Sequence, residues 1–437
     1  MRELWVRNLV ALCAAQLLTL IGFSAYFPFI PFFFQELGVG GYDAAVAWSA
    51  AFTSGAAFSM MVFQPIWGAL ADRVGRKAML VRATAAGAVL AFAMGLARTP
   101  ELLVFLRVLQ GIFCGTVAAA LTLVAAETPD ENMGFALGMM QTAQFVGNAV
   151  GPLLGGLVAD AYSSRTVFTV SSCLMAVSVM VVVGVVRESR QPDARARTIS
   201  LRPMFAGMRQ VLNGSSLALL VALASVSFGA AVVSPILSLY VQALSPGAPN
   251  IATVAGAVTA SVSVTSSIAA FVLGRVGDRM GQRKVLVICL LGSAALYFPQ
   301  AMVGSPYALL VVRALQGAFM GGVMPSGNAL LARMTPPERR GSVFGVASSL
   351  EAGGRAIGPL VGAAVAGAWT MGASFVAAGL VFVVIGLWVL GFVQAGKGKL
   401  AAPAGQAGLA SASAGAAGGV LATECSADPH KVSTPSR

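Results

Sequence analysis

A carboxylate and a guanidinium lie four residues apart inside a long apolar stretch of this sequence. Glu351 and Arg355 share one face of a helix at i and i+4, so they can form an ion pair. Glu351 is the only carboxylate that we place deep within an apolar run. Two interpretations follow: a structural salt bridge, or a carboxylate that exchanges a proton in competition with Arg355 or a substrate.

Arg107 is another cation inside an apolar run, and Arg313 occupies a similar position later in the chain. Arg107 falls about six residues, or roughly 9 Å, into a predicted helix at 101–126. Its side chain can snorkel to the nearer surface, or it can face the protein interior.

Two groups of side chains could bind a small molecule. Gln141, Gln144 and Asn148 recur at i, i+3 and i+7, which predicts one polar stripe along a cavity. Tyr26 belongs to an aromatic segment around Pro28 and Pro31 whose rings could bind flat apolar molecules or cations. The alternative for its last three phenylalanines, residues 32–34, is lipid contact in an interfacial aromatic belt.

Enzyme chemistry finds little support in the sequence. The only histidine, His430, falls in the C-terminal tail, and no nucleophile, base and orienting group cluster together. The five cysteines share no metal-ligand spacing. We therefore expect no enzymatic activity, no metal site and no cofactor.

The elements that must position these residues are membrane-spanning helices. The composition is 57% hydrophobic and only 10% charged, which a water-soluble surface does not tolerate. Apolar runs long enough to cross about 30 Å of hydrocarbon recur along the chain, and backbone inside lipid must be helical. We predict twelve spans, near residues 9–34, 44–66, 78–97, 101–126, 134–159, 166–186, 215–243, 252–274, 284–303, 306–332, 341–367 and 370–394.

The distribution of basic residues predicts the orientation. With both termini, the segments after even-numbered spans carry 23 Lys and Arg residues, against 2 on the opposite side. By the positive-inside rule, both termini are cytoplasmic. The net charge of +12 thus indicates the lipid bilayer as a partner, and not nucleic acid.

The sequence predicts four segments. They are an N-terminal six-helix bundle at 1–186, an Arg-rich cytoplasmic linker at 187–214, a C-terminal six-helix bundle at 215–394 and a disordered cytoplasmic tail at 395–437. A shift of 206 residues superposes 68–80 on 274–286 and RVLQG at 107–111 on RALQG at 313–317. With one further inserted residue, 147–156 aligns with 354–363, so the two bundles are copies of one unit.

Three motifs carry a resemblance to a known family. Gly68, Leu70, Asp72, Arg73, Gly75, Arg76 and Lys77 match a GxLaDrxGrk signature; Leu103, Arg107, Gln110 and Gly111 match LxxxRxxQG; Gly147, Gly151, Pro152, Gly155 and Gly156 match GxxxGPxxGG. Over about residues 5–394, the chain resembles the major facilitator superfamily and, within it, the twelve-span drug:proton antiporters. That resemblance implies an all-α polytopic membrane protein with twelve transmembrane helices in two pseudo-symmetric six-helix bundles.

The first motif then implies a conformational switch. The resemblance places Asp72 near the start of span 11, around Gly341, where the positive helix end and Arg339 or Arg340 can hold the carboxylate. Asp278, followed by Arg279, is the repeated equivalent near span 5. The alternative is that the loop's cations only anchor the topology.

The other two motifs imply roles in coupling. The resemblance favours an inward-facing Arg107 near span 1 that interacts with a proton site or substrate. In span 5, Gly147, Gly151 and Gly155 form a groove for close helix packing, and Pro152 removes one backbone donor. This seam either serves packing alone or, as in antiporters, limits leak between the halves. Span 1 carries no acid, which departs from many drug antiporters.

The predicted function is secondary active transport in a plasma (inner) membrane. Our first hypothesis is proton-coupled export of small amphipathic compounds or drugs by alternating access, by a monomer whose partners are the substrate, protons and the bilayer. The alternative is a major facilitator carrier for a specific metabolite or sugar. A membrane enzyme or a receptor that does not transport is the third class.

Overall fold

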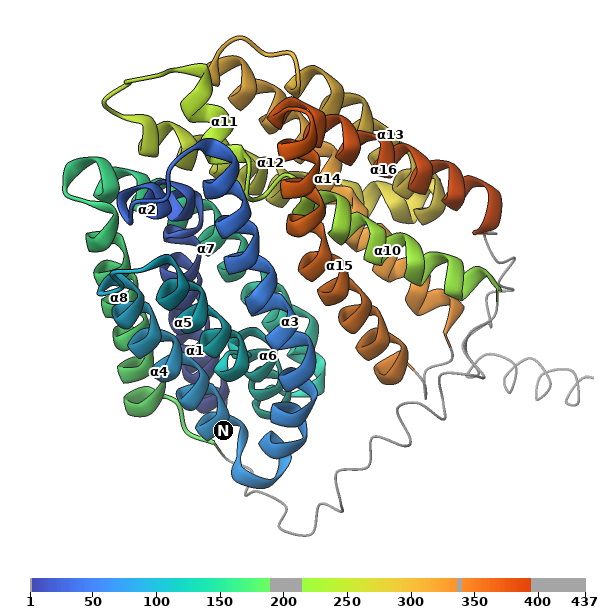
Figure 1. Ribbon diagram of the computed structural model, residues 1–437. Coiled ribbons are helices and arrows are strands. Elements are labelled where there is room, and N and C mark those ends of the chain that lie inside the picture. The colour runs from blue at the N-terminus through green and yellow to red at the C-terminus, as the bar shows by residue number, and fades with distance from the viewer. Residues whose placement is uncertain (1, 189–213, 336–339, 394–437) are drawn as a thin grey trace, which may run out of the picture. The chain divides into compact units, whose positions relative to one another are not determined.

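The computed structural model describes residues 2–188, 214–335 and 340–393. The regular secondary structure within these residues is helical (Figure 1). Most of the predicted linker at 187–214 and the predicted tail at 395–437 lie outside the described residues.

The N-terminal half forms six consecutive rods. Its elements are α1 (Arg2–Ala25), η1 (Phe27–Phe29), α2 (Ile30–Glu36), α3 (Tyr42–Val74), α4 (Arg76–Gly95), α5 (Pro100–Phe113), α6 (Thr116–Glu127), η2 (Asp130–Asn132), α7 (Met133–Ala161) and α8 (Ser164–Val185). Two rods are interrupted: α1, η1 and α2 form one, and α5 and α6 form another. Pro28 and Pro31 explain the first interruption, because proline cannot donate to the preceding turn.

The C-terminal half repeats this order. Its elements are α10 (Gly214–Val232), α11 (Leu237–Leu244), α12 (Ile251–Met280), α13 (Gln282–Gln300), α14 (Pro306–Met334), α15 (Arg340–Ala368) and α16 (Met371–Phe392). Pro235 separates α10 from α11, so the described helices make twelve rods in two sets of six. Among the described residues, eight stretches are long and apolar enough to cross a membrane; the α5–α6 rod, α7, α13 and α15 are not among them.

The repeat is visible in the backbone. Gly75 joins α3 to α4 with φ +106°, and Gly281 joins α12 to α13 with φ +95°. Residues with a Cβ rarely adopt such positive φ angles, so both tight turns require glycine. The two glycines are 206 positions apart, which is the shift that the sequence alignment gave.

The rods alternate between two ends of the molecule. We call the end that carries residues 2, 188, 214 and 393 the terminal end, and the opposite one the distal end. At the terminal end, Asn8 donates from Nδ2 to the Arg187 carbonyl oxygen at 2.7 Å. At the distal end, Arg165 Nη1 donates to the Gly95 carbonyl oxygen at 2.9 Å.

Each half has an apolar core of its own. In the N-terminal half, Phe33 and Phe34 are 0% exposed and pack with Tyr26 and Phe168. Lipid contact is therefore the wrong interpretation for these two phenylalanines. The sequence could not decide this, because an apolar ring suits lipid and core equally.

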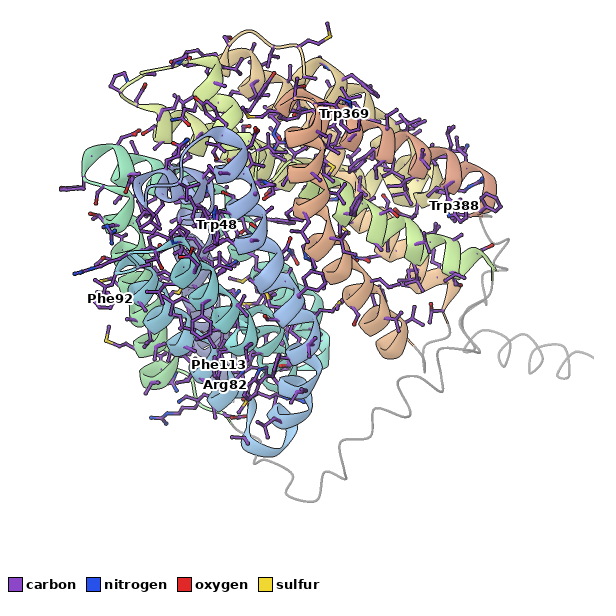
Figure 2. The ribbon with its side chains drawn as sticks, viewed as in Figure 1. Trp48, Arg82, Phe92, Phe113, Trp369 and Trp388 are labelled. Carbon is purple, nitrogen blue, oxygen red and sulfur yellow. The ribbon has the colours of Figure 1, made fainter. Side chains whose placement is uncertain are left out.

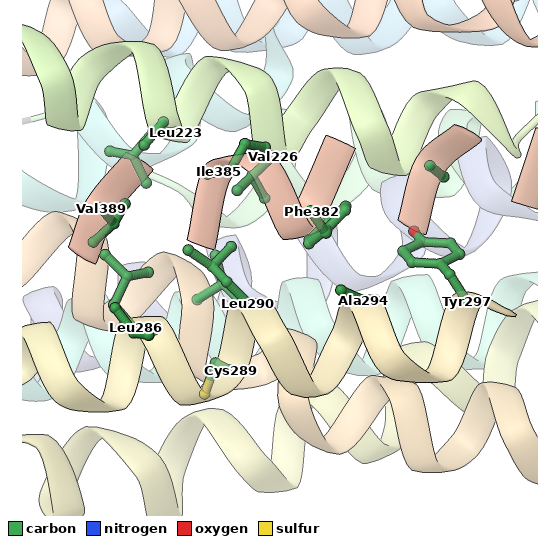
Figure 3. Close-up of a cluster of buried hydrophobic side chains, with 14 of the residues drawn as sticks. Leu223, Val226, Leu286, Cys289, Leu290, Ala294, Tyr297, Phe382, Ile385 and Val389 are labelled. Carbon is green, nitrogen blue, oxygen red and sulfur yellow. The ribbon is translucent and has the colours of Figure 1, made fainter. Parts of the chain in front are cut away.

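In the C-terminal half, α10, α13 and α16 enclose a second core. Figure 3 shows side chains of this core along the contact between the helices, among them Val226 from α10, Leu290 and Tyr297 from α13, and Phe382 from α16. By contrast, Phe92 and Trp388 lie on the outside (Figure 2), among many exposed apolar side chains. Such a surface is stable in lipid and not in water.

Candidate functional site

A buried guanidinium lies at the centre of the N-terminal half. Arg107 on α5 is 7% exposed, and its Nη1 donates to the Tyr26 hydroxyl at 2.9 Å and to Gln110 Oε1. Tyr26 in turn donates to Gln110 Oε1 at 3.1 Å, while Gln110 Nε2 donates to the Gly87 carbonyl oxygen at 3.3 Å. Of the two orientations left open by the sequence, the structure has Arg107 facing inward.

Aromatic rings surround the same guanidinium. The Arg107 Cζ lies 4.9 Å from the centroid of the Phe27 ring and 5.1 Å from that of Phe52. These π faces offer a partial substitute for the water that burial removes. Tyr26, predicted to bind substrate, supports Arg107 but does not line either of the two cavities described next.

Two contiguous cavities open beside Arg107. The first, of about 270 Å³, is lined by the N-terminal half, including Gln110 and Asn148. The second, of about 460 Å³, is lined by both halves and reaches Arg355 on α15. They share Phe27, Ala56, Met60 and Arg107.

The predicted polar stripe on α7 reaches these cavities at one position only. Asn148 lines the smaller cavity, whereas Gln141 and Gln144 are absent from the described lining of both. Gln144 is instead buried in the helix packing. A period of i, i+3, i+7 fixes a helix face but not how far along it a cavity extends.

Glu351 and Arg355 form the predicted ion pair on α15. Arg355 Nη1 lies 3.7 Å from Glu351 Oε2, with the Arg355 side chain 52% exposed and that of Glu351 15% exposed. Arg355 lines the larger cavity opposite Arg107. The carboxylate is thus mostly enclosed, while its partner reaches into the space where a solute could bind.

The glycine motif of α7 packs against α1. A Cβ on Gly151 would overlap with Ser24 Oγ, and one on Gly155 would overlap with the carbonyl oxygen of Ala25. Ser24 also donates to the Gly147 carbonyl oxygen at 3.0 Å. The repeat-related Gly354, Gly358 and Gly362 on α15 meet α10 in the same way. The glycines of the motif therefore lie where the two helices are too close for a side chain.

Comparison with known proteins places this architecture in a family. The sequence model of the Major Facilitator Superfamily matches residues 12–255 and 219–424. The chain belongs to that superfamily. Multidrug resistance protein MdtG of Salmonella arizonae is 33% identical over 378 residues, covering 86% of this chain and 93% of the relative. MdtG of Citrobacter koseri is 34% identical with the same coverage.

A solved structure agrees with the fold. The crystal structure of the nucleoside transporter NupG superposes with a TM-score of 0.74 over 87% of this chain and 99% of NupG, at 12% identity. This supports the major facilitator fold of twelve helices predicted from the sequence.

In this facilitator-superfamily chain, part of the α7 motif also meets the other half. A Cβ on Gly156 would lie 2.7 Å from the Thr253 Cα on α12, and one on Gly256 would overlap with the Pro152 carbonyl oxygen. Pro152 and Gly156 thus lie in the distal contact between halves, whereas Gly151 and Gly155 lie within one half.

Sequence reasoning missed an acid in this contact. Asp160, at the distal end of α7, accepts from the backbone N–H of Ala252 at 3.2 Å and of Thr253 at 2.7 Å. These are first-turn N–H groups of α12, where a negative charge is favourable. Gln35 and Gln242 also join the halves here, at 3.3 Å. Only the fold reveals these pairings, because their members lie far apart in sequence.

At the terminal end, the switch motif is described in part. Arg76 and Lys77 donate their backbone N–H groups to Glu188 at 2.9 and 3.2 Å, and Lys77 Nζ donates to the Val186 carbonyl oxygen at 2.7 Å. Both residues are thereby tied to the N-terminal half, and Glu188 is a second acid that the sequence did not single out. The side chains of Asp72, Arg73 and Asp278, the space around Gly68, and the predicted partner Arg339 lie outside the described residues.

Proposed function

We propose that this chain exports small amphipathic compounds across a plasma (inner) membrane in exchange for protons. The observation that carries the proposal is the cavity of about 460 Å³ lined by both halves, with an apolar wall and two guanidinium groups. An apolar pocket with few polar groups accepts chemically varied solutes. The relatives' name, multidrug resistance protein, supports this direction of transport.

Glu351 is the proposed proton site. Coupling needs a group that changes charge within the membrane, and Glu351 is mostly enclosed beside a cavity-lining arginine. When the carboxylate is protonated, its attraction for Arg355 is lost and the guanidinium is free to rearrange. Arg107, in the other half, is the second charged group of the proposed coupling site.

The proposed orientation has both termini in the cytoplasm. The 23 to 2 distribution of basic residues supports it, since cations are retained on that side. The terminal end is then cytoplasmic and the distal end faces outward. We further propose that the protein works as a monomer, without a cofactor or a nucleic-acid partner, and that it has no enzymatic activity.

Asp72 and Asp278 are proposed to hold the cytoplasmic ends of the halves together in one state and to release them in the other. Asp72→Asn should then leave expression intact, impair transport and change the balance of inward- and outward-facing states. Wild-type transport together with unchanged crosslinking across the cytoplasmic gate would contradict this role.

Purified protein in proteoliposomes tests the main proposal. Candidate solutes from a growth-inhibition panel are added while the pH inside the liposomes is recorded. A substrate should move protons out of the lumen or into it, depending on the orientation of the protein in the liposome membrane. Empty liposomes control for passive movement. If solutes are transported without any associated movement of protons, the proposed proton coupling is wrong.

The second candidate is a carrier for one metabolite or sugar. The fold alone permits it, as the likeness to NupG illustrates. A carrier of this kind should discriminate sharply among close analogues and leave growth inhibition by unrelated compounds unchanged. The apolar wall of the larger cavity favours the exporter.

A further inference from the structure

Within the described part of the chain, the buried charge of Arg107 has no carboxylate partner. Among the described residues, no Asp or Glu lines either cavity, and the printed hydrogen bonds of Arg107 go to neutral groups, Tyr26 and Gln110. Its Nε is buried and has no hydrogen-bond partner in the described part of the chain. An enclosed cation without a counter-charge is costly, so an anion that enters the cavity is strongly attracted.

A helix N-terminus faces the same cavity. The span that contains Arg107 breaks between Phe113 and Thr116, and α6 begins with Gly115 as a cap that has no side chain to satisfy the first N–H groups. Gly115, Thr116 and Val117 all line the smaller cavity. The first N–H groups of a helix carry partial positive charge and bind anions.

Trp67 on α3 contacts the chain next to the break between α5 and α6. Trp67 Nε1 on α3 donates to the Ile112 carbonyl oxygen at 2.6 Å, and Arg82 stacks on the Trp67 ring at 3.4 Å. Phe113, labelled next to Arg82 in Figure 2, lies 6.2 Å from the same ring. Irregular backbone at this depth in a membrane persists where it lines a cavity.

We infer that the smaller cavity is a binding site for the anionic group of the substrate, held by Arg107 and the N-terminus of α6. A carboxylate, sulfonate or phosphonate is bound there, and the apolar body of the compound occupies the adjoining cavity of about 460 Å³. Arg355 adds a second positive charge to that cavity. The inference rests on the proposed export and narrows its substrates to amphipathic organic anions.

This charge changes the energetics of export. Export of one monovalent anion in exchange for one proton moves two net positive charges inward. The same exchange moves one net charge for a neutral solute and none for a monovalent cation. Each charge that crosses 100 mV changes the equilibrium gradient about fiftyfold. An inside-negative potential imposed without a pH gradient should therefore accelerate export of the anion most.

Three probes with one skeleton isolate the charge: 4-(1-naphthyl)butanoate, the corresponding butanol and the corresponding butylamine. Their binding to the purified full-length protein in detergent is measured by fluorescence titration at neutral pH. We expect the anion to bind at least about tenfold more tightly than the alcohol, and the amine more weakly still. Equal or tighter binding of the alcohol or the amine overturns the inference.

Variants locate the site. Arg107→Gln should abolish the preference for the anion over the alcohol, while Arg107→Lys, which keeps the charge, should retain part of it. The matched control is Arg313→Gln, which removes the repeat-related arginine; Arg313 donates to Gln316 Oε1 at 3.2 Å and lines neither cavity. A preference that survives in folded Arg107→Gln, or that disappears equally in folded Arg313→Gln, contradicts the site.

The wild-type measurement does not depend on any variant folding. Transport of the same probes in proteoliposomes separates this inference from the proposed export. An anion that binds selectively but is not moved by a proton gradient supports the site and contradicts the export. Transport of the alcohol or amine in preference to the anion supports the export and contradicts the site.

Discussion

At the scale of single residues, Glu351 is the residue on which proton coupling most directly depends. We predict that Glu351→Gln abolishes proton-driven accumulation, because the amide cannot carry a proton across the barrier in exchange for substrate. Substrate binding and passive exchange should persist, and Glu351→Asp should retain some coupling. Uphill export is measured in proteoliposomes with an imposed pH gradient. If Glu351→Gln folds and still drives uphill export with unchanged pH dependence, the proton site is elsewhere.

Arg355→Ala distinguishes the two interpretations of the Glu351–Arg355 pair, a structural salt bridge and a proton-exchange site. The 3.7 Å separation and the 52% exposure of Arg355 indicate a weak ion pair, worth at most about 1 kcal/mol of folding free energy. We therefore expect Arg355→Ala to fold with nearly wild-type thermal stability and to transport with altered coupling. A purely structural salt bridge predicts the reverse: unfolding of either single variant, and rescue when both residues are neutralised.

At the same scale, the sequence singles out charged residues as candidates but does not show what surrounds them. Only the family resemblance favours an inward-facing Arg107. Its contact with Tyr26, 81 positions away, depends on how the kinked first rod packs against α5. The break at Gly115 was not predicted either, because TVAAALTLVAAE reads as a continuation of the preceding helix.

At the scale of elements, the α1–α7 seam can be tested with two glycines of one helix. We predict that Gly155→Ala lowers the free energy of unfolding by about 1–3 kcal/mol or more, because its Cβ overlaps with the Ala25 carbonyl oxygen. Gly138→Ala, where no atom lies within 4 Å of the new Cβ, should be neutral or stabilising by up to about 1 kcal/mol. Thermal unfolding in detergent compares them, and equal midpoints would show that the helices can separate without cost.

Hydrophobic patterning located most elements and left their interruptions undecided. The predicted span at 101–126 is two helices, and the first span includes a proline-rich 3-10 turn at Phe27–Phe29. Pro28 and Pro31 were visible in the sequence, but whether proline bends a helix or ends it is decided by the neighbours that satisfy the freed backbone groups.

At the scale of the whole molecule, orientation is a direct prediction. Single cysteines introduced between residues 190 and 213 should resist an impermeant thiol reagent in intact cells and react after permeabilisation, because the segment is proposed to be cytoplasmic. A cysteine introduced in the 245–250 loop at the distal end is the control that should react in intact cells. Labelling of the linker without permeabilisation would invert the topology.

Alternating access requires that the distal contact opens during each cycle. Gln35 on α2 and Gln242 on α11 join the two halves there. We predict that a bifunctional thiol reagent across Gln35→Cys and Gln242→Cys reduces transport to the background level, because the halves can no longer separate at this end. Cys173, which is exposed, is replaced by serine in the starting protein.

The control crosslink joins two elements of one half. Ser164 on α8 donates to Glu36 on α2, so Glu36→Cys with Ser164→Cys brings the same chemistry to the same end of the molecule. This crosslink should leave transport largely intact, since it restrains no movement between halves. Full transport by the crosslinked Gln35/Gln242 pair would mean that substrate does not leave through the distal end, and that the contact made by Asp160 with α12 is permanent.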